Sequence, residues 1–364
     1  MALNVTKLMV GARAHASKNR TLGTVYQLCQ QYNALPPTAG NKARIDLIHL
    51  IARMAGDYLT SKPPQGSYKN TLRWEGLTDV LEQLGAESKA AGVRMITGPT
   101  DYRKIDDSHR SYWLELLDPM HRAGFTLSPK YSTWLTDTTA IQTKKSFWAY
   151  IGTKASGSDS STDVAYLNEG QGPKQYQVEF DASGLLVESI GDQPYSTRLH
   201  ETAFSGDGWA IFVVSPTGEL YSASHIVGKL HHSSFLGGRP VMAAGELVSE
   251  DGVVKVLTAK SGHYRPSPDD LLRMVRQFPM IPSDAVIRPD LQDEKHLKYV
   301  AFYRVGDFRA KGLNAKPVSQ QDALACLPAW ARAPKAMDQF DDIPKAGREA
   351  ATAGIGPGLG RHRG

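Results

Sequence analysis

The stretch Lys229–Pro266, KLHHSSFLGGRPVMAAGELVSEDGVVKVLTAKSGHYRP, is the most informative part of this chain. Apolar runs flank Glu250-Asp251-Gly252, and such an Asp-Gly pair is typical of a tight hairpin turn. Two histidines and two serines precede Gly237-Gly238, and Ser261-Gly262-His263-Tyr264-Arg265-Pro266 closes the stretch. A hairpin built only for stability would not need these groups. We therefore predict a functional site in this hairpin.

Periodic patterns around the stretch predict the other elements. Apolar residues three or four apart predict a helix over 41–59, and weaker patterns predict helices over 24–32 and 74–91. Ser267-Pro268-Asp269-Asp270 is a typical helix start and predicts a helix over 267–278. Short alternating runs predict strands. These lie at 146–151, 163–167, 174–180, 185–190, 209–215, 218–224, 241–248 and 253–259, with a closing strand at 297–305.

The predicted fold class is α+β. We expect a helical N-terminal region over residues 1–114 and a mostly antiparallel, β-rich domain over 115–310. Residues 331–364 are rich in Ala, Gly, Pro and charge, with few large apolar groups to offset the entropy cost of ordering. We therefore predict a disordered tail over 331–364.

Composition narrows the classes of function. The chain has 364 residues, which suffices for two domains, and 42 basic against 37 acidic residues, for a net charge of +5. This small excess is compatible with a protein partner or a small anionic ligand, and it disfavours nucleic acid, which calls for dense basic patches. Cys29 and Cys326 cannot build a disulfide framework or a cysteine-rich metal site. We find no P-loop and no GxGxxG after a strand.

No segment of the sequence resembles a signal peptide or a membrane span. The N-terminus lacks the apolar core of a secretory signal, and no run approaches the length of about 20 apolar residues that crosses a bilayer. We expect a soluble protein made in the cytoplasm, a reducing compartment. Export by a secretion system that needs no signal peptide stays open.

The stretch 229–266 supplies the candidate site residues. Neighbouring strand residues point to opposite faces, so only one of His231 and His232 can face a site, and we assign His232. Glu246 lies among apolar residues, and a buried carboxylate needs a partner such as His232, His263 or Arg265. The predicted catalytic residues are His232, Glu246, His263 and Tyr264. The predicted substrate-binding residues are Ser233, Ser234, Gly237, Gly238 and Arg265. The histidine spacing forms no HExxH-type set, so we predict no metal.

Each of these residues also has a plain structural explanation. His232 could hydrogen-bond a buried backbone carbonyl, the two serines could bond to the hairpin backbone, and Gly237-Gly238 could simply form a tight turn. These alternatives stay open at the level of sequence.

Six motifs in order resemble one known family, the plant IQ-motif-containing (IQM) proteins, which bind calmodulin. They are DPMHRAG (118–124), FWAYIG (147–152), YQVEFDASGLL (176–186), HSSFLGG (232–238), AAGEL (243–247) and SGHYRP (261–266). The resemblance is to the large domain of that family and covers about residues 115–280. Ile141-Gln142-Thr143-Lys144-Lys145 begins like an IQ motif, but no arginine follows at the expected positions. Calmodulin binding therefore does not carry over.

Two hypotheses about function follow. The first is an effector- or toxin-like enzyme, with the hairpin as a transferase site such as that of an ADP-ribosyltransferase. Histidine, tyrosine, serine and glutamate on a small sheet are residue types that hold nicotinamide, which suggests NAD as cofactor. A hydrolase using a histidine, Glu246 and a serine is a variant of this hypothesis. The alternative is a non-catalytic module that binds a protein partner, calmodulin-like or other, or a small ligand.

Overall fold

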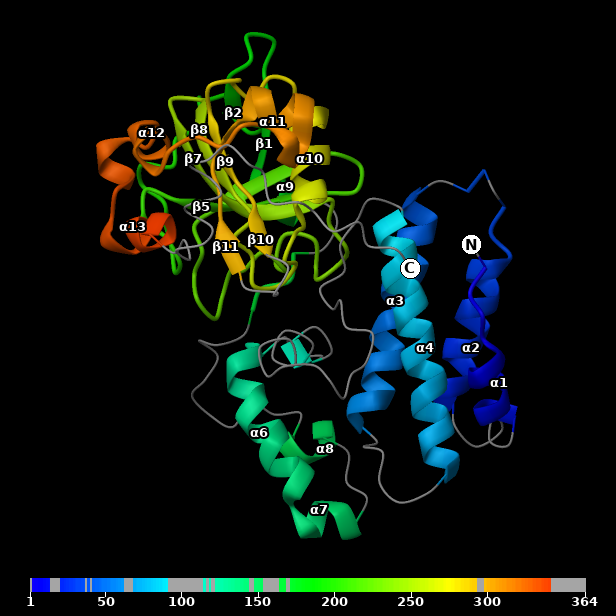
Figure 1. Cartoon of the computed structure of the whole chain (residues 1–364). Helices are drawn as coiled ribbons and strands as arrows, with labels where there is room; N and C mark the ends of the chain where they lie inside the picture. Colours follow the sequence, from blue (N-terminus) through cyan, green and yellow to red (C-terminus); the bar gives the residue numbers. More distant parts are fainter. Residues whose placement is uncertain are drawn as a thin grey trace. The chain divides into compact units, whose positions relative to one another are not determined.

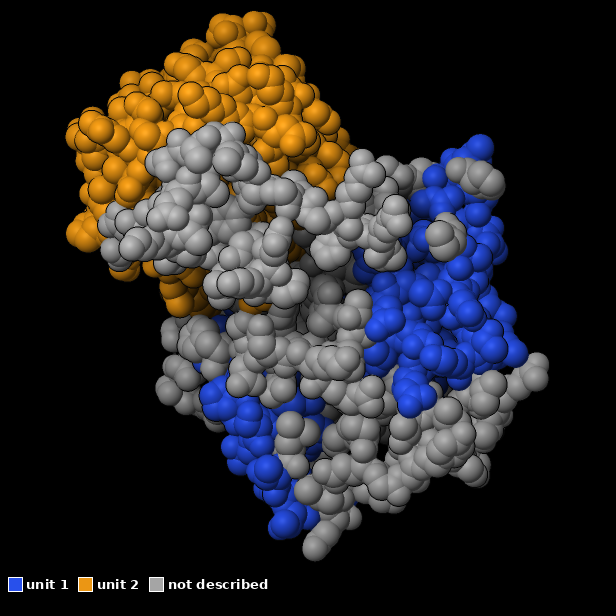
Figure 2. All heavy atoms as spheres, viewed as in Figure 1, with its two compact units in different colours: residues 1–166, 237–240 blue, residues 167–236, 241–364 orange. Residues whose placement is uncertain are grey.

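The structure is a computed structural model of the chain. It describes residues 2–13, 20–36, 38–39, 41–61, 68–90, 114–115, 118, 122–143, 147–152, 164–167, 171–292 and 298–341. Contacts divide the chain into two compact units, coloured separately in Figure 2. Unit 1 comprises Met1–Tyr166 and Gly237–Pro240, and unit 2 comprises Leu167–Leu236 and Val241–Gly364. The domain limits at 114 and 310 that we derived from sequence remain predictions.

Helices make up the described part of unit 1. They are α1 (Thr6–Arg13), α2 (Arg20–Asn33), α3 (Asn41–Ser61), α4 (Tyr68–Ala90), α6 (Gly124–Thr136), α7 (Thr138–Gln142) and α8 (Phe147–Ile151). The three N-terminal helices that the periodicity predicted correspond to α2, α3 and α4. A Cβ on Gly76 would lie 2.7 Å from the backbone nitrogen of Leu8, so α1 and α4 approach each other closely at this glycine.

The DPMHRAG motif is held by a buried ion pair. Arg122 Nε lies 2.7 Å and Nη2 3.0 Å from the two carboxylate oxygens of Asp118, and the backbone N–H of Arg122 donates to the same carboxylate. Nη1 of Arg122 also donates to the carbonyl of Gly152, just after α8. Such a fork-shaped contact fixes orientation as well as charge. This motif of the family resemblance therefore ties the start of α6 to the end of α8.

Unit 2 is built on an eight-stranded sheet with the order β12-β9-β8-β7-β5-β6-β1-β2 (Figure 1). Its strands are β1 (Gln177–Phe180), β2 (Leu186–Glu188), β5 (Ala210–Val214), β6 (Leu220–Ala223), β7 (Ala243–Glu250), β8 (Val253–Thr258), β9 (Val286–Arg288) and β12 (Tyr303–Arg304). Two small pairs accompany it, β3 (Glu201–Thr202) with β4 (Gly206–Asp207), and β10 (Asp290–Gln292) with β11 (Lys298–Val300). All pairs within the sheet are antiparallel except β8 with β9.

Helices and loops cover both faces of this sheet. Leu247, Leu257 and Ile287 pack on one face in a core with Met274 of α10 (Pro268–Gln277) and Phe308 of α11 (Val305–Lys311). Residues one position away along the same strands pack in a second core on the other face. That core contains Val248, Val256, Val286, Trp209 and Phe302, together with residues of α12 (Gln320–Ala325) and α13 (Pro334–Asp341). In Figure 1, α10 and α11 lie together, and α12 and α13 lie together elsewhere on the sheet.

The α+β class and the mostly antiparallel sheet are confirmed. The predicted helix 267–278 is α10, and its start is a capping box in which Ser267 N donates to Asp270 Oδ2 at 2.6 Å. Because α10 connects β8 to its parallel neighbour β9, this helix is the crossover of a β-α-β unit.

Several sequence-based assignments were wrong. The predicted strand 146–151 is helix α8, whose Phe147 packs on Tyr131 and Trp134 of α6, and tertiary packing has overridden an aromatic-rich pattern. Residues 164–167 form no strand. Only β7 and β8 form the hairpin, since residues 232–238 form turns. Residues 334–341 form α13 with Phe340 fully buried, so disorder does not begin at 331, and residues 342–364 lie outside the described part.

Among the described residues, no helix combines the length and the apolar character that a membrane span requires.

Candidate functional site

His232 lies in the turns that precede β7 and is almost fully buried. Its Nε2 is 2.8 Å from the carbonyl oxygen of Gly245 on β7. Because a carbonyl oxygen can only accept, Nε2 carries the proton. Burial lowers the pKa of His232 well below its usual range, the bond to Gly245 opposes this, and nearby His225, His263 and His231 add to the lowering. His232 is therefore a neutral donor with the structural role that we stated as its alternative.

His231 has the opposite tautomer. The backbone N–H of Gly228 donates to its Nε2 at 2.9 Å, so the ring proton is on Nδ1. The ring lies 5.0 Å from that of His225 and 5.2 Å from that of His263, measured between centroids. His231 thus belongs to a cluster of four histidines with His225, His232 and His263.

Glu246 points from the middle of β7, between Ile211 of β5 and Thr258 of β8. Its side chain is fully buried, and the hydroxyl of Ser205 donates a hydrogen bond to Oε2. Ser205 lies in the turn between β3 and β4, and its backbone N–H donates to Thr202 Oγ1 at 3.0 Å. The sequence predicts His232, His263 or Arg265 as a partner of Glu246, and no pattern in it indicates Ser205.

The serine pair of HHSS is part of a backbone turn. Ser234 Oγ accepts from the N–H of His231 at 2.9 Å, and the N–H of Ser234 donates to the carbonyl of His231 at 2.9 Å. The carbonyl of Ser234 accepts from the N–H of Leu167 at 2.8 Å. Ser233 is fully buried beside it. Gly237 and Gly238 have φ of 59° and 75°, left-handed values that explain the two glycines by backbone geometry.

The SGHYRP corner is also a turn. Ser261 Oγ accepts from the N–H of Tyr264 at 3.3 Å, and the carbonyl of Ser261 accepts from the N–H of Arg265 at 3.1 Å. His263 and Tyr264 are buried, and Arg265 is half-buried with a φ of 45°. The structure thus brings the imidazoles of His232 and His263 into one cluster. A ligand-binding role for the nine predicted residues stays a prediction.

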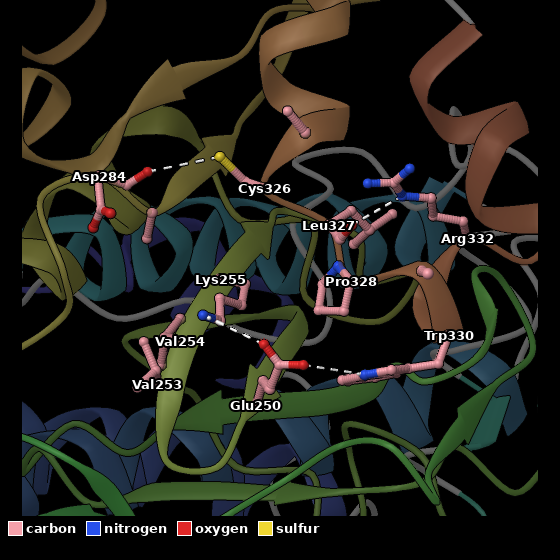
Figure 3. A pocket seen from close by; sticks show the side chains of 13 residues that line it. Glu250, Val253, Val254, Lys255, Asp284, Cys326, Leu327, Pro328, Trp330 and Arg332 are labelled. Carbon is pink, nitrogen blue, oxygen red and sulfur yellow. Dashed lines mark hydrogen bonds and ion pairs between the residues drawn. The ribbon is translucent and has the colours of Figure 1, made fainter.

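Three grooves among the described residues of unit 2 are lined by other side chains. The largest of these three, about 540 Å³, is the Trp330 groove shown in Figure 3. The carboxylate of Glu250 lies between Lys255 and Trp330. Lys255 Nζ is 3.5 Å from Glu250 Oε2, and the indole N–H of Trp330 donates to Glu250 Oε1 at 3.3 Å. Arg332 Nε donates to the carbonyl of Leu327 at 2.9 Å, and Cys326 Sγ faces the carbonyl of Asp284. Opposite charges pair within this groove.

The second groove, about 300 Å³, lies beside β1 and β6, and we call it the Tyr176 groove. Tyr195 donates from its hydroxyl to Ser222 Oγ at 2.9 Å, and His200 Nδ1 lies 3.0 Å from Ser224 Oγ. Burial raises the pKa of Tyr195 and lowers the pKa of His200. The full lining is Gln175, Tyr176, Gln177, Val178, Glu188, Tyr195, His200, Ser222, Ala223, Ser224, Ile226 and Leu230.

Large apolar side chains are exposed around the Tyr176 groove. Ile226 lines it and is 48% exposed, and Val227 beside it is 57% exposed. Leu199, which precedes the lining residue His200, is 96% exposed. Buried surface stabilises a fold, so a group of exposed aliphatic side chains beside a cavity is typical of an interaction site. The sequence analysis did not single out these residues, since isolated apolar residues in loops give no periodic signal.

The third groove, about 340 Å³, is the Met280 groove at the other end of β1. It is lined by Gln177–Phe180, Thr217–Leu220 and Gln277–Met280, so it shares Gln177 and Val178 with the Tyr176 groove. The hydroxyls of Ser215 and Thr217 donate to the carboxylate of Glu219 on its rim. Although burial opposes it, these bonds lower the pKa of Glu219, which is therefore ionised near neutral pH.

Comparison with known proteins confirms the family resemblance. Residues 173–271 match the model of the IQ motif-containing protein middle domain. This range runs from just before β1 through β8 into α10, and it includes the histidine cluster, the Tyr176 groove and most of the lining of the Met280 groove.

Three Arabidopsis thaliana proteins illustrate the similarity. IQ domain-containing protein IQM5 is 33% identical over 175 residues, which are 45% of this chain and 32% of the relative. IQM3 is 32% identical over 171 residues, 44% of this chain and 35% of the relative. IQM1 is 31% identical over 211 residues, 54% of this chain and 40% of the relative. The chain thus spans about a third of the length of these curated relatives. No solved structure matches the chain.

These comparisons correct our first hypothesis about function. The relatives are IQ domain-containing proteins, and nothing in the matches supports an effector, a toxin or a transferase. The prediction of an effector-like transferase was wrong, and the alternative of a non-catalytic binding module is better supported. The residue types that suggested catalysis, His232 and Glu246 among them, are used in bonds within the fold.

Proposed function

We propose that unit 2 is a non-catalytic binding module whose ligand is a protein partner. One observation carries the proposal. Ile226 and Val227 are exposed beside the Tyr176 groove, whereas the chemically versatile His232 and Glu246 are buried and hydrogen-bonded inside the fold. A binding module is expected to combine these two features.

The Tyr176 groove suits a side chain of a partner protein. Its volume of about 300 Å³ has room for one large apolar side chain, and a single such anchor in a pocket often dominates the energy of an interface. Around it, Ile226, Val227 and Leu199 would bury aliphatic surface that is now exposed to water. Each largely exposed aliphatic side chain that becomes covered contributes roughly 1.5 kcal/mol or more.

Other ligand classes rank lower. A small anionic ligand would need free cations, but in the Trp330 groove Lys255 pairs with Glu250 and Arg332 bonds to a carbonyl. The carboxylate of Glu188 lines the Tyr176 groove, which disfavours nucleic acid there. Calmodulin binding belongs to an IQ helix. Here Ile141 and Gln142 end the five-residue α7, while Lys144 and Lys145 lie outside the described residues.

The test is site-specific crosslinking in the full chain. A photoreactive amino acid replaces Val227, the protein is irradiated in a lysate of cells that naturally make it, and the crosslinked product is identified. Ile226→Ser should reduce the yield of that product by about tenfold, because the apolar wall of the groove is lost.

Two control variants test whether the partner binds at the Tyr176 groove or at the site predicted around His232. Leu50→Ser changes a similarly exposed aliphatic residue, 42% exposed, in unit 1 and should leave the product unchanged. His232→Gln keeps a donor for Gly245 and should also leave it unchanged. The proposal fails if Ile226→Ser has no effect, or if His232→Gln abolishes the product while the protein stays folded by circular dichroism.

A further inference from the structure

The charge of the region around β1 differs in sign from that of the whole chain. Residues 175–228 contain seven acidic residues and one basic residue, Arg198, although the chain carries a net charge of +5. The acidic residues are Glu179, Asp181, Glu188, Asp192, Glu201, Asp207 and Glu219. Between residues 175 and 197 there is no Lys or Arg at all. This concentration of negative charge gives the surface a preference for one class of partner.

The fold places three of these carboxylates on the rims of the two grooves at β1. Glu188 of β2 lines the Tyr176 groove, and Glu179 of β1 and Glu219 line the Met280 groove. β1 and β2 are antiparallel neighbours, with Val178 opposite Glu188 and Glu179 opposite Val187. Because neighbouring residues of a strand alternate, Glu179 and Glu188 point to opposite faces of the sheet, on either side of its edge at β2. The described residues that line either groove include no Lys or Arg.

Glu179 and Glu188 are exposed to water. The pKa of Asp181, in the β1–β2 turn, is lowered by the hydrogen bond from Ser183 and by backbone N–H groups. An exposed carboxylate with no basic residue on its groove rim is available to a cation from outside.

Apolar surface accompanies the acidic residues. Ile226 and Leu230 line the Tyr176 groove, and Phe278, Pro279 and Met280 line the Met280 groove, where Met280 is 43% exposed. Gln177 and Val178 belong to both linings, so the two grooves meet at β1. A ligand that used the whole surface would need apolar side chains for the grooves and cations for the rims.

We infer that the partner presents a basic, apolar segment to β1. Its Lys or Arg side chains pair with Glu179, Glu188 and Glu219, and its apolar side chains enter the Tyr176 and Met280 grooves. The inference rests on the proposed function and names the class of partner. Complementary charge of this kind raises the association rate and fixes the register, while the apolar anchors supply most of the affinity.

A defined probe tests this inference. The probe is a fluorescein-labelled twelve-residue peptide of alternating Lys and Leu pairs, and its control peptide has Glu in place of Lys. Fluorescence anisotropy with the full chain should show saturable binding of the Lys peptide only. Binding should weaken by about tenfold between roughly 50 and 300 mM salt, because surface ion pairs are screened.

A matched pair of variants locates the binding. Glu179→Gln/Glu188→Gln should weaken the affinity by about five- to tenfold, whereas Asp269→Asn/Asp307→Asn removes the same charge from α10 and α11 and should change it less than about twofold. Equal weakening by both variants, or equal binding of the Glu peptide, overturns the inference. If no peptide binds while crosslinking at Val227 still depends on Ile226, the class of partner is wrong and the proposed function stands. If crosslinking at Val227 does not depend on Ile226, the proposed function itself is wrong.

Discussion

The imidazole of His232 donates to the carbonyl of Gly245 over 2.8 Å, and this bond joins the HHSS turn to the central strand β7. Gly245 also lies opposite Phe212 of β5. Two of the motifs that resemble the IQM family, HSSFLGG and AAGEL, thus meet in one buried hydrogen bond. This contact explains His232 and Gly245 without a catalytic role.

There is no space for a side chain at position 245. A Cβ at residue 245 would lie 1.8 Å from the carbonyl oxygen of Thr258 and 2.9 Å from Cε1 of Phe212. Backbone in the middle of a sheet cannot move aside cheaply, so Gly245→Ala should cost about 3 kcal/mol or more in free energy of unfolding. Urea unfolding followed by tryptophan fluorescence measures this cost.

Gly85→Ala is the matched control for Gly245→Ala. Gly85 lies inside α4, and no atom is within 4 Å of the position that its Cβ would take. Because alanine favours a helix over glycine, this change should stabilise unit 1 by roughly 0.5–1 kcal/mol. A similar loss of stability in both variants would contradict the packing argument.

The buried His232 should make the stability of unit 2 depend on pH. Its pKa in the folded state is lowered, so below about pH 6.5 the unfolded chain takes up a proton that the folded chain does not. The free energy of unfolding should therefore fall as the pH decreases below this value, by up to about 1.4 kcal/mol per pH unit for one group. Urea titrations at a series of pH values check the slope.

His232→Gln removes the titrating group and keeps an N–H donor for Gly245. This variant should show a smaller slope between about pH 6.5 and the lower pKa, although other histidines contribute. In unit 1, burial, Arg53 and Arg239 lower the pKa of His49 of α3 to about 4, so this histidine should give the unfolding of that unit a pH dependence of the same sign. An unchanged slope in both His232→Gln and His49→Gln would show that neither histidine is the cause.

The Asp118–Arg122 pair allows a test of unit 1. Asp118→Asn would leave the guanidinium of Arg122 buried without its charge partner, and breaking such a pair typically costs about 3–5 kcal/mol. Thermal unfolding followed by circular dichroism should show the loss. The double variant Asp118→Leu/Arg122→Met should be more stable than Asp118→Asn, since it buries no charge. If Asp118→Asn is as stable as the parent, the Asp118–Arg122 ion pair does not stabilise unit 1.

The sequence predicted most elements of unit 2 that have strong local signals. The Asp251-Gly252 turn, the strands β5 to β8 and the capped start of α10 depend on neighbours along the chain, and all are present. The strand at 146–151 failed because Phe147 finds its partners, Tyr131 and Trp134, on another helix. The periodicity of a short stretch does not indicate contacts with residues on another element.

The site was harder to predict for the same reason. The sequence analysis offered a buried backbone carbonyl as an alternative partner of His232, but it did not indicate that this carbonyl belongs to Gly245. It predicted that Glu246 needs a partner, but it did not indicate Ser205, which is 41 positions away. Neither pairing has a sequence signature. The grooves at β1 depend on loops that meet only in the fold, so no single stretch of sequence indicated them.

The C-terminal helix α13 supplies the last prediction. Phe340 is fully buried and stacks on Phe302 with ring centroids 4.8 Å apart, in the core that also contains Trp209, whose indole N–H donates to the carbonyl of Ala331 at 3.0 Å. Phe340→Ala should therefore destabilise unit 2 by about 3–5 kcal/mol, the usual cost of deleting a buried aromatic ring. Lys335→Ala, on the exposed face of the same helix, should change stability by less than about 0.5 kcal/mol. Urea unfolding of the two variants compares them directly. Equal stability of Phe340→Ala and the parent would mean that α13 does not hold this core, and that the tail predicted from residue 331 was the better description.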